Sequence, residues 1–408
     1  MKLKNLPDGW SDKSFDEVAI LSRGHNPPKS EFIYKPKKGY VRFYQIRDGK
    51  SDDYEVYVPE TSQLHRVEPN DILMVAYRHI GRVFRGASGA FNVALCKIQN
   101  KDHSIIDDDY LFYIIPTEFV RGELMKQAER SLIPSMSVKH LAEIRIPVPP
   151  IEEQNRIVAI VDQAFEAIDG AIENTKQNLV NARELFESYL NDVFTQKGRD
   201  WDNLALETLT ERITKGSSPK WQGVNYVDKP GVLFVTSENV GQNQMLFEKI
   251  KYVEEIFNEI DSKSILICGD VLTNIVGASI GRTAIYDREE LANINQAVCL
   301  IRCKPDKLLN HYLAYLLNSP YFLQILHDNE IDNARANLSL GFFRGLQIPL
   351  PLLDEQQSIV SKMDNFSTET QRLEAIYRQK LAALTELKQS ILQKAFTGEL
   401  TADSANAR

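Results

Sequence analysis

One short motif occurs twice in this 408-residue chain, 202 positions apart. It reads IPVPPIEEQ at residues 146–154 and IPLPLLDEQ at residues 348–356. When the alignment is continued without a gap, residues 146–198 and 348–400 share 16 identities in 53 positions, clustered at the two ends of the window. Self-similarity on this scale indicates a duplicated structural unit.

Each copy of the motif predicts an abrupt change from extended chain to helix. Alternate prolines fix φ and keep the preceding residue out of the helical region, so the extended segment must end there. Glu152 and Glu153, like Asp354 and Glu355, then fall in the first helical turn. Negative charge there complements the free N–H groups and the helix dipole.

An apolar heptad pattern follows each motif. The first copy steps by fours and threes through Ile168, Ile172, Thr175, Leu179, Ala182, Phe186, Tyr189 and Val193. The second presents Tyr377, Leu381, Leu384, Ile391 and Phe396, with Leu373, Leu387 and Leu392 widening the face. Each helix would be roughly 60 Å long if unbroken, and Gly170 is a candidate for a kink. Because globular helices average about 11 or 12 residues, two helices of this length at equivalent positions favour mutual pairing over two ordinary surface helices.

The segments before the two motifs read as globular domains. Residues 1–145 contain β-branched and aromatic runs at 40–46, 54–58, 71–76 and 91–98, broken by Gly, Pro or Asp. The segment 199–347 repeats its landmarks: Gly24 with Pro28-Lys29 matches Gly216 with Pro219-Lys220, and Ile80-Gly81-Arg82 matches Ile280-Gly281-Arg282. We therefore expect domains at 1–145 and 199–347, long helices with their extended leads at 146–198 and 348–400, and a tail at 401–408.

These features resemble the specificity subunits of type I restriction-modification systems. The resemblance covers essentially the full length and rests on the two motifs, the Leu-x-x-x-Phe-Thr helix ends at 190–195 and 392–397, and the Ile-Gly-Arg turns. It implies an α+β fold: two mixed α/β target-recognition domains separated by two long helices that form an antiparallel coiled coil, with a pseudo-two-fold repeat.

The same resemblance implies a non-catalytic cytoplasmic protein. Each domain would read one half of a split target in double-stranded DNA, and the helices would dock two methyltransferase subunits. Restriction/translocase subunits would join that assembly. The chain would carry no cofactor, and S-adenosylmethionine, ATP and Mg²⁺ would be bound by the partner subunits. Two diverged readers on a rigid spacer would recognise two different blocks at a fixed separation.

The net charge of −8 is unfavourable for a nucleic-acid partner, but its distribution is uneven. Residues 1–150 hold 22 basic and 20 acidic groups, whereas 151–198 hold 4 and 9 and 199–350 hold 15 and 19. DNA contact must therefore come from local basic patches. Phosphates attract Lys and Arg, while Arg or Asn can discriminate bases. The candidate DNA-binding residues are Lys29, Lys35, Lys37, Lys38, Arg47, Arg78, His79, Arg82, Arg85, Lys215, Lys220, Asn274, Arg282 and Arg335.

Each candidate also has a plainer interpretation as a solvated surface charge, because exposed Lys and Arg are common. The pairs Lys29/Lys220 and Arg82/Arg282 are favoured because they recur in both copies. A Gly-Arg sequence after an apolar strand can still be only a turn.

Catalytic signatures are weak throughout the sequence. Asn26-Pro27-Pro28-Lys29 is similar to the Asn-Pro-Pro-aromatic motif of amino-methyltransferases, but the fourth residue is a lysine that cannot stack on a flipped base. No Walker loop, HExxH or clustered histidine pair occurs. The acidic run at 107–109 reads as a solvated loop better than as a Mg²⁺ site. We therefore predict no catalytic residue and no metal site in this chain.

Two further features bear on where the chain works. The sequence predicts no membrane-spanning helix and no signal peptide. Its four cysteines, Cys96, Cys268, Cys299 and Cys303, form no CxxC pair and read as buried thiols in a reducing compartment. The alternative function is a coiled-coil scaffold or adaptor without sequence-specific DNA binding. Net acidity favours it, and the two diverged globular domains count against it.

Overall fold

The computed structural model describes residues 6–128, 135–195, 201–229, 231–331 and 336–401. By its internal contacts the chain forms two compact units. Unit 1 comprises residues 1–175 and 379–408, and unit 2 comprises residues 176–378. Each unit therefore combines one globular domain with one end of each long helix.

Unit 1 contains a strand pair and two four-stranded sheets. The pair is β1 (Ser11–Ser14) with β10 (Arg145–Val148). The first sheet has the order β2 (Ala19–Arg23), β9 (Leu95–Asn100), β6 (Ile72–Val75) and β7 (Val83–Phe84). The second has the order β4 (Tyr57–Pro59), β3 (Tyr40–Tyr44), β8 (Gly89–Phe91) and β5 (Arg66–Val67). Its short helices are α1 (Phe15–Val18), η1 (Lys29–Glu31), η2 (Ile46–Gly49), α2 (Asp108–Ile114), η3 (Glu118–Gly122), α3 (Glu123–Ala128) and α4 (Val138–Glu143).

Unit 2 repeats this plan. Its strand pair is β11 (Asp202–Ala205) with β20 (Gln347–Leu350). One sheet has the order β12 (Thr210–Lys215), β19 (Val298–Cys303), β16 (Val271–Asn274) and β17 (Thr283–Ile285), and the other β13 (Tyr226–Val227), β15 (Tyr252–Val253), β14 (Val232–Val235) and β18 (Ala292–Ile294). Its short helices are η4 (Leu206–Leu209), η5 (Pro219–Gln222), η6 (Ser237–Asn239), α6 (Ile256–Ile260), η7 (Ser262–Ser264), η8 (Gly277–Ser279), α7 (Asn310–Asn318), α8 (Pro320–Asp328) and α9 (Leu340–Gly345).

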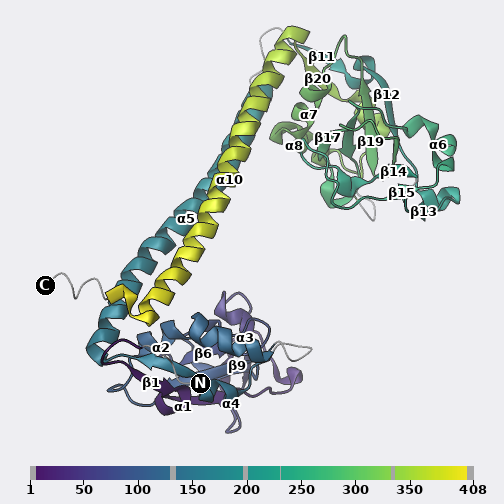
Figure 1. The fold of residues 1–408 in the computed structure, drawn as a ribbon. Helices are drawn as coiled ribbons and strands as arrows, with labels where there is room; N and C mark the ends of the chain where they lie inside the picture. Colours follow the sequence, from purple (N-terminus) through teal and green to yellow (C-terminus); the bar gives the residue numbers. More distant parts are fainter. Residues whose placement is uncertain (1–5, 129–134, 196–200, 230, 332–335, 402–408) are drawn as a thin grey trace. The chain divides into compact units, whose positions relative to one another are not determined.

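The internal duplication extends to strand direction. In both units the second sheet holds one parallel pair, β3 with β8 in unit 1 and β14 with β18 in unit 2, while its other pairs are antiparallel. In both units the helix that follows the long central strand, α2 or α7, belongs to the main hydrophobic core, and Figure 1 shows α7 beside β17. The repeat read from the sequence is therefore a repeat of topology, except that the fourth strand of the second sheet joins opposite edges: β5 pairs with β8 in unit 1, and β13 pairs with β15 in unit 2.

The proline-rich motif makes the predicted change from strand to helix in both copies. Residues 145–148 and 347–350 form β10 and β20, and the long helices α5 (Ile151–Thr195) and α10 (Leu353–Thr397) begin three residues later. The strand and polyproline leads of the two spacer segments are thus part of each domain's own strand pair.

The glutamine that ends each motif is fully buried and holds three backbone groups. Gln154 Oε1 accepts from the Asp107 N–H (2.8 Å), and its Nε2 donates to the carbonyls of Ile105 (2.9 Å) and Pro149 (2.8 Å). Gln356 does the same with Leu309 (2.9 Å), Lys307 (2.9 Å) and Pro351 (3.0 Å). Each glutamine ties the first turn of a long helix to the loop before α2 or α7.

In each unit, two tyrosines of α2 or α7 reinforce this junction. Tyr110 donates to the Pro147 carbonyl (2.9 Å) and Tyr312 to that of Pro349 (2.6 Å). One turn later, Tyr113 donates to Asp162 and Tyr315 to Asp364. Burial, together with these carboxylates, raises the pKa values of Tyr113 and Tyr315 above their usual range. Both tyrosines are therefore neutral donors at physiological pH.

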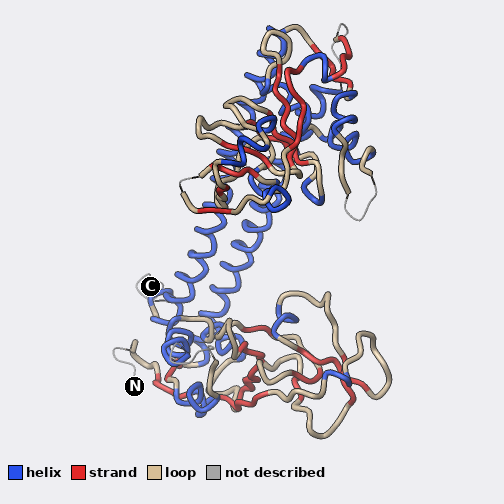
Figure 2. The backbone as a smooth tube through the Cα atoms, turned by 90° about the vertical axis from the view of Figure 1, so that its right-hand side faces the viewer, coloured by secondary structure: helices blue, strands red, loops and turns tan. Residues whose placement is uncertain are grey.

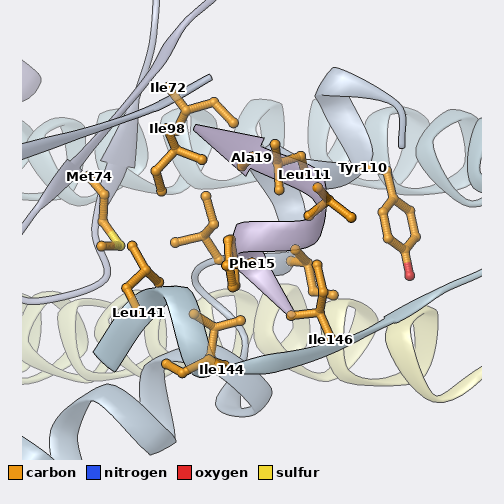
Figure 3. Packing of buried hydrophobic residues seen from close by; sticks show 14 of the residues in the cluster. Phe15, Ala19, Ile72, Met74, Ile98, Tyr110, Leu111, Leu141, Ile144 and Ile146 are labelled. Atoms are coloured by element: carbon orange, nitrogen blue, oxygen red, sulfur yellow. The ribbon is translucent and has the colours of Figure 1, made fainter. Parts of the chain in front are cut away.

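The core of unit 1 takes residues from both ends of the chain. Phe15 of α1 packs with Leu141, Ile144 and Ile146 around α4 and β10 (Figure 3). Phe396, near the end of α10, belongs to the same cluster, and its ring centroid lies 4.9 Å from that of Tyr110. In unit 2 the corresponding aromatic pair is Phe194 of α5 with Tyr312, at 5.5 Å. Each domain is thus completed by the C-terminal end of the other domain's helix.

The long helices lie side by side and antiparallel (Figures 1 and 2). In unit 2, Phe186 and Tyr189 of α5 pack on Phe366 of α10, with ring centroids 5.8 and 5.1 Å apart. In unit 1, Lys388 of α10 lies over the Phe165 ring at 4.5 Å and pairs with Asp169 at 2.5 Å. The pairing predicted from the heptads is confirmed.

The predicted seam is confirmed for the first helix and partly wrong for the second. All eight seam residues of α5 are buried or half-buried, and α5 is one uninterrupted helix through Gly170. In α10, Leu373 and Leu387 are exposed (41% and 46%), because the contact stripe is narrower than the apolar face of the sequence. Among the strand predictions, 91–98 divides into β8 and β9, and 54–58 is shorter than expected.

Candidate nucleic-acid interface

A glycine fixes the start of the first basic segment in each domain. A Cβ on Gly24 would lie 2.2 Å from the Phe91 and Asn92 carbonyl oxygens, and one on Gly216 would lie 1.7 Å from that of Ile294. Only glycine fits this close approach to the neighbouring backbone. The chain then makes a short 3₁₀ turn, which carries Lys29 in η1 and Lys220 in η5. The structure thus places this lysine pair at equivalent turns, and both side chains are exposed.

The basic residues of unit 1 lie before and after β3. The lysines that precede this strand, Lys29, Lys35, Lys37 and Lys38, are all exposed, as is Arg47 after it. Lys37 Nζ lies 5.0 Å from the Tyr40 ring centroid, and the Arg47 guanidinium lies 5.5 Å from that of Tyr54. Aromatic faces thus support two of these cations without removing their charge from solvent.

The turn between β6 and β7 carries a second basic group, and its Arg82 reaches η2, which follows β3. Gly81 has φ +84°, and Arg82 beside it donates to the Gly49 carbonyl of η2. Arg78 and His79 are exposed, and Arg78 has φ +63°. Arg82 is thereby held next to the segment that carries Arg47.

Arg85 is engaged within the protein. Its guanidinium pairs with Asp109 at 2.5 Å and lies 4.3 Å from the Phe112 ring centroid. These contacts hold the Arg85 side chain against α2, so its guanidinium is not a free cation.

Unit 2 presents fewer basic candidates. Lys215, Lys220 and Arg282 are exposed, and Arg282 follows Gly281 (φ +86°) in the turn equivalent to that of Arg82. Arg335 lies outside the described residues. The exposed Trp221 (79%) directly follows Lys220, as Tyr34 (71%) follows the turn of Lys29. Sequence reasoning missed Trp221, although a tryptophan next to a repeated lysine was a usable signal.

Asn274, expected as a base reader, is buried inside the domain. Its Nδ2 donates to the Ser237 carbonyl at 3.0 Å and lies 3.2 Å from Ser279 Oγ. It therefore connects β16 to η6 and presents no polar group at the surface. Its position late in a strand, beside the Ile-Gly-Arg turn, gave no sign of this burial.

The acidic run and the cysteines have structural surroundings. Asp107 caps α2, accepting from the N–H groups of Asp109 and Tyr110 at 2.9 Å, so the run is not the solvated loop expected from the sequence.

Cys96 and Cys299 are buried, and burial raises the pKa of Cys96 to about 11. Cys268 is exposed, contrary to the expectation of buried thiols. Within the described ranges, no group of His, Cys, Asp and Glu side chains could hold a metal ion.

Comparison with known proteins identifies the family. The model of the "Type I restriction modification DNA specificity domain" matches residues 7–182 and again 198–383, once on each half of the chain. The chain belongs to the type I restriction-modification specificity subunits. It is accordingly the non-catalytic component that determines the DNA target, with two target-recognition domains, and specificity subunits of this family carry no cofactor of their own.

Specificity subunits of two other systems match this specificity subunit over nearly its whole length. The MjaVIII specificity subunit of Methanocaldococcus jannaschii is 24% identical over 98% of this chain and 95% of its own length. The EcoBI specificity subunit of Escherichia coli is 26% identical over 98% of this chain and 88% of its own.

Two solved structures share the fold. One, from a study of complex assembly and conformational transition of the type I system, has a TM-score of 0.77 at 21% identity and covers 97% of this chain and all of its own. The HsdS subunit of Thermoanaerobacter tengcongensis has a TM-score of 0.59 at 21% identity, with 97% and 98% covered. The specificity subunit therefore takes part in a type I restriction-modification complex. In the described part of the chain, no helix is long and apolar enough to span a membrane.

Proposed function

We propose that the domains at 1–145 and 199–347 each read one half of a bipartite target in double-stranded DNA. In this proposal the paired helices dock two methyltransferase subunits in the cytoplasm, and restriction/translocase subunits join the complex. S-adenosylmethionine, ATP and Mg²⁺ belong to those partners. The observation that carries the proposal is the equivalent 3₁₀ turn of each domain, which exposes a lysine with an aromatic residue nearby.

The exposed cations divide into two proposed roles. The lysines near β3 and in η5 are point charges suited to phosphates, and Arg47, Arg78 and Arg282 have the forked geometry that suits guanine. Tyr34 and Trp221 add flat, exposed apolar surface beside them. The proposed interface consists of Lys29, Lys35, Lys37, Lys38, Arg47, Arg78, His79, Arg82, Lys215, Lys220 and Arg282, with Tyr34 and Trp221. Asn274 is left out because it is buried, and Arg85 is left out because its guanidinium pairs with Asp109.

Divergence between the two surfaces supports recognition of two different blocks. Unit 1 carries the four-lysine segment before β3, whereas the matching stretch of unit 2 has Lys220, Trp221 and Lys229, the last paired with Glu290. The helix junctions of the two domains, in contrast, match bond for bond. A constant frame with variable surfaces is what two readers at a fixed separation require.

The test is methylation sequencing of DNA from cells that express the chain with its methyltransferase subunit. In two further strains, residues 1–145 or 199–347 are exchanged for those of another family member. We expect a split motif of which one half follows each exchange. A motif whose two halves both change after a single exchange would contradict the proposal that each domain recognises its own half of the target. Complete absence of a motif, with DNA binding insensitive to salt, would favour the scaffold alternative.

A further inference from the structure

A loop of unit 2 presents exposed amide side chains beside the Ile-Gly-Arg turn that carries Arg282. The loop follows η6 and comprises residues 241–244, which we call the amide loop; its exposed residues are Gln242, Asn243 and Gln244. The Asn243 N–H donates to the carbonyl of Thr283 at 2.8 Å, and Thr283 directly follows Arg282 in the chain. The amide loop and the exposed arginine therefore lie together at the start of β17.

Hydrogen bonds on both sides fix the backbone of the amide loop. The Gly241 N–H donates to the Gln244 carbonyl at 3.0 Å. Asn243 has φ +54°, and its Oδ1 accepts from Nδ2 of Asn318 at 2.8 Å. Before the loop, the buried Asn239 donates from Nδ2 to two carbonyls of the chain that follows the loop, both at 2.9 Å. A loop held in this way loses little conformational entropy when it binds a ligand.

Gln242 and Gln244 keep their side-chain amides available to a ligand. Among the described residues neither amide is hydrogen-bonded, whereas the amide of Asn243 is engaged by Asn318. Each glutamine amide is a planar group with an acceptor oxygen and two N–H donors. Such a group matches the adjacent N7 acceptor and N6 donor that adenine presents in the major groove, whereas guanine presents two acceptors there.

The amide loop lies at the same edge of the second sheet as the lysine turn of unit 2. β14 and β18 are parallel, and η6 with the amide loop follows the carboxyl end of β14. At the carboxyl end of β18, the Ile294 carbonyl lies against Gly216, where the segment that carries Lys220 begins. The Asn295 N–H, just after β18, donates to the Val235 carbonyl at the end of β14 at 3.0 Å. Amides and cations therefore gather at one edge of this sheet.

The matching place in unit 1 keeps the support and changes the exposed side chains. Arg82 of the equivalent turn donates there to the carbonyl of Gly49, which directly precedes the positions that match the amide loop. Asp48 and Asn239 make the same bond, since each accepts from the backbone N–H of the residue that caps its 3₁₀ helix. The exposed residues of the matching loop are Lys50, Ser51, Asp52 and Asp53. A constant support with different exposed chemistry is typical of loops that determine what a scaffold recognises.

We propose that Gln242 and Gln244 are base-reading residues that select adenine in the half of the target recognised by the second domain. This inference rests on the proposed function and adds to it the residues and the base. Each glutamine donates from Nε2 to N7 of an adenine and accepts at Oε1 from its N6 amino group. Neither carries the positive charge that attracts phosphates, so the two glutamines supply discrimination while Arg282 and the lysines supply affinity.

The first experiment is methylation sequencing of DNA from cells that express the full-length chain with its methyltransferase subunit. The variants are Gln242→Ala, Gln244→Ala, Gln242→Glu and Gln244→Glu. Asn203→Ala is the matched control, because Asn203 is an exposed amide of the same unit that lies in β11, in the strand pair at the lead of α10.

We expect each alanine variant to relax one adenine position in the half of the motif that follows residues 199–347. Each glutamate variant should favour cytosine at that position, because a carboxylate accepts from the cytosine N4 amino group and cannot donate to N7 of adenine. The half that follows residues 1–145 should stay unchanged in all four variants, and Asn203→Ala should leave both halves unchanged. Melting temperatures should match that of the unaltered chain, because both glutamines are exposed.

A second experiment separates base reading from phosphate contact. Fluorescence anisotropy measures binding of the purified chain and methyltransferase subunit to the target duplex and to a duplex in which 7-deaza-adenine replaces the adenine. Loss of N7 should weaken binding of the unaltered chain by about two- to tenfold, as for one hydrogen bond, and should not weaken binding of the corresponding alanine variant.

Three outcomes would overturn the inference and leave the proposed function intact. They are a motif unchanged in all four variants, a second half without any A·T pair, and weaker binding that is equal on every sequence and insensitive to 7-deaza-adenine. The last of these would assign the glutamines to the phosphate backbone. Failure of the unaltered chain to direct methylation to any motif would overturn the proposed function and the inference together.

Discussion

The two domains make the same hydrogen bonds where they meet the long helices. Gln154 and Gln356 bind matching loops, and Tyr110 and Tyr312 donate to matching proline carbonyls. In the second sheet the domains differ. Arg42 of β3 is buried against Asp48 of η2 at 2.7 Å, whereas the matching positions in unit 2 are Leu233 and Asn239. The hydrogen bonds at the helix junction are therefore the same in both domains, whereas the buried residues of the second sheet differ in charge and polarity.

The largest effect is expected at the constant junction. Gln154→Leu and Gln356→Leu each remove three hydrogen bonds, of which the one to the Pro149 or Pro351 carbonyl is buried, so each should lower the free energy of unfolding by about 3 kcal/mol. Denaturant unfolding of the two variants should give equal losses. A large loss for one variant and none for the other would show that the matching bonds do not carry matching energy.

Two further variants test the difference between the second sheets of the two domains. Arg42→Leu copies unit 2 but strands Asp48, whose side chain is 1% exposed, and should cost about 3 kcal/mol. The double variant Arg42→Leu/Asp48→Asn copies unit 2 at both positions and should recover much of that loss. Denaturant midpoints measure both, and no recovery in the double variant would contradict the equivalence of the two sites.

The proposed DNA contacts allow a matched test of the two surfaces. Lys29→Ala and Lys220→Ala should each reduce the slope of log affinity against log salt by about 0.9, because each removes one phosphate contact. Fluorescence anisotropy with a duplex that contains the target, at several salt concentrations, gives the slopes. An unchanged slope for either variant would remove that lysine from the interface.

A smaller effect distinguishes the two ends of the helix pair. Arg183 of α5 donates to Glu374 of α10 at 2.8 Å in unit 2, and the matching positions in unit 1 are Thr385 and Ile172. The bond holds the pKa of Glu374 below its ordinary value of 4.5. Its contribution, at most about 1 kcal/mol for a partly exposed pair, is complete above pH 4.5 and is lost as the pH falls through the depressed pKa. Glu374→Gln should therefore lower stability at about pH 7, and in thermal unfolding its difference from the unaltered chain should shrink as the pH falls below 4.5.

The smallest expected effect is a gain. Gly170 lies inside α5, a Cβ added to it would have no neighbouring atom within 4 Å, and α10 carries Arg372 at the matching place. Gly170→Ala should raise stability by about 0.5 to 1 kcal/mol through helix propensity and a less flexible unfolded chain. A loss on thermal unfolding would show that this glycine serves a bend.

The sequence predicted the features that depend on local geometry or on repetition. Alternating prolines followed by acids determine a change from strand to helix within a few residues, and β10 with α5 and β20 with α10 follow that rule. The equivalence of Lys29 and Lys220 was readable because the close backbone approach at Gly24 and Gly216 tolerates no other residue. Helix pairing was predictable because the heptad pattern is also a local feature of the sequence.

Features that depend on distant segments could not be predicted. Asn274 is buried because Ser237, 37 positions earlier, presents its carbonyl to it. Arg85 is held by Asp109, 24 positions later and beyond both β8 and β9. Leu387 is exposed because its partner helix covers a narrower stripe. Residue type and spacing do not indicate which distant residues will be neighbours. From the sequence, the same Asn or Arg can therefore be assigned equally well to the surface or to the interior.

The core of unit 1 has a consequence for synthesis on the ribosome. Leu392, Ala395 and Phe396 complete the cluster that begins at Phe15, and a Cβ on Gly398 would lie 2.6 Å from Pro7. At about 5 to 20 residues per second, the first domain waits roughly 10 to 45 s after residue 175 leaves the peptidyl-transferase centre before its last core residues are made. Unit 2, whose residues 176–378 are continuous, can finish first. The domain that is translated first is therefore the last to close, and premature termination near the end of the message would leave it with an open core.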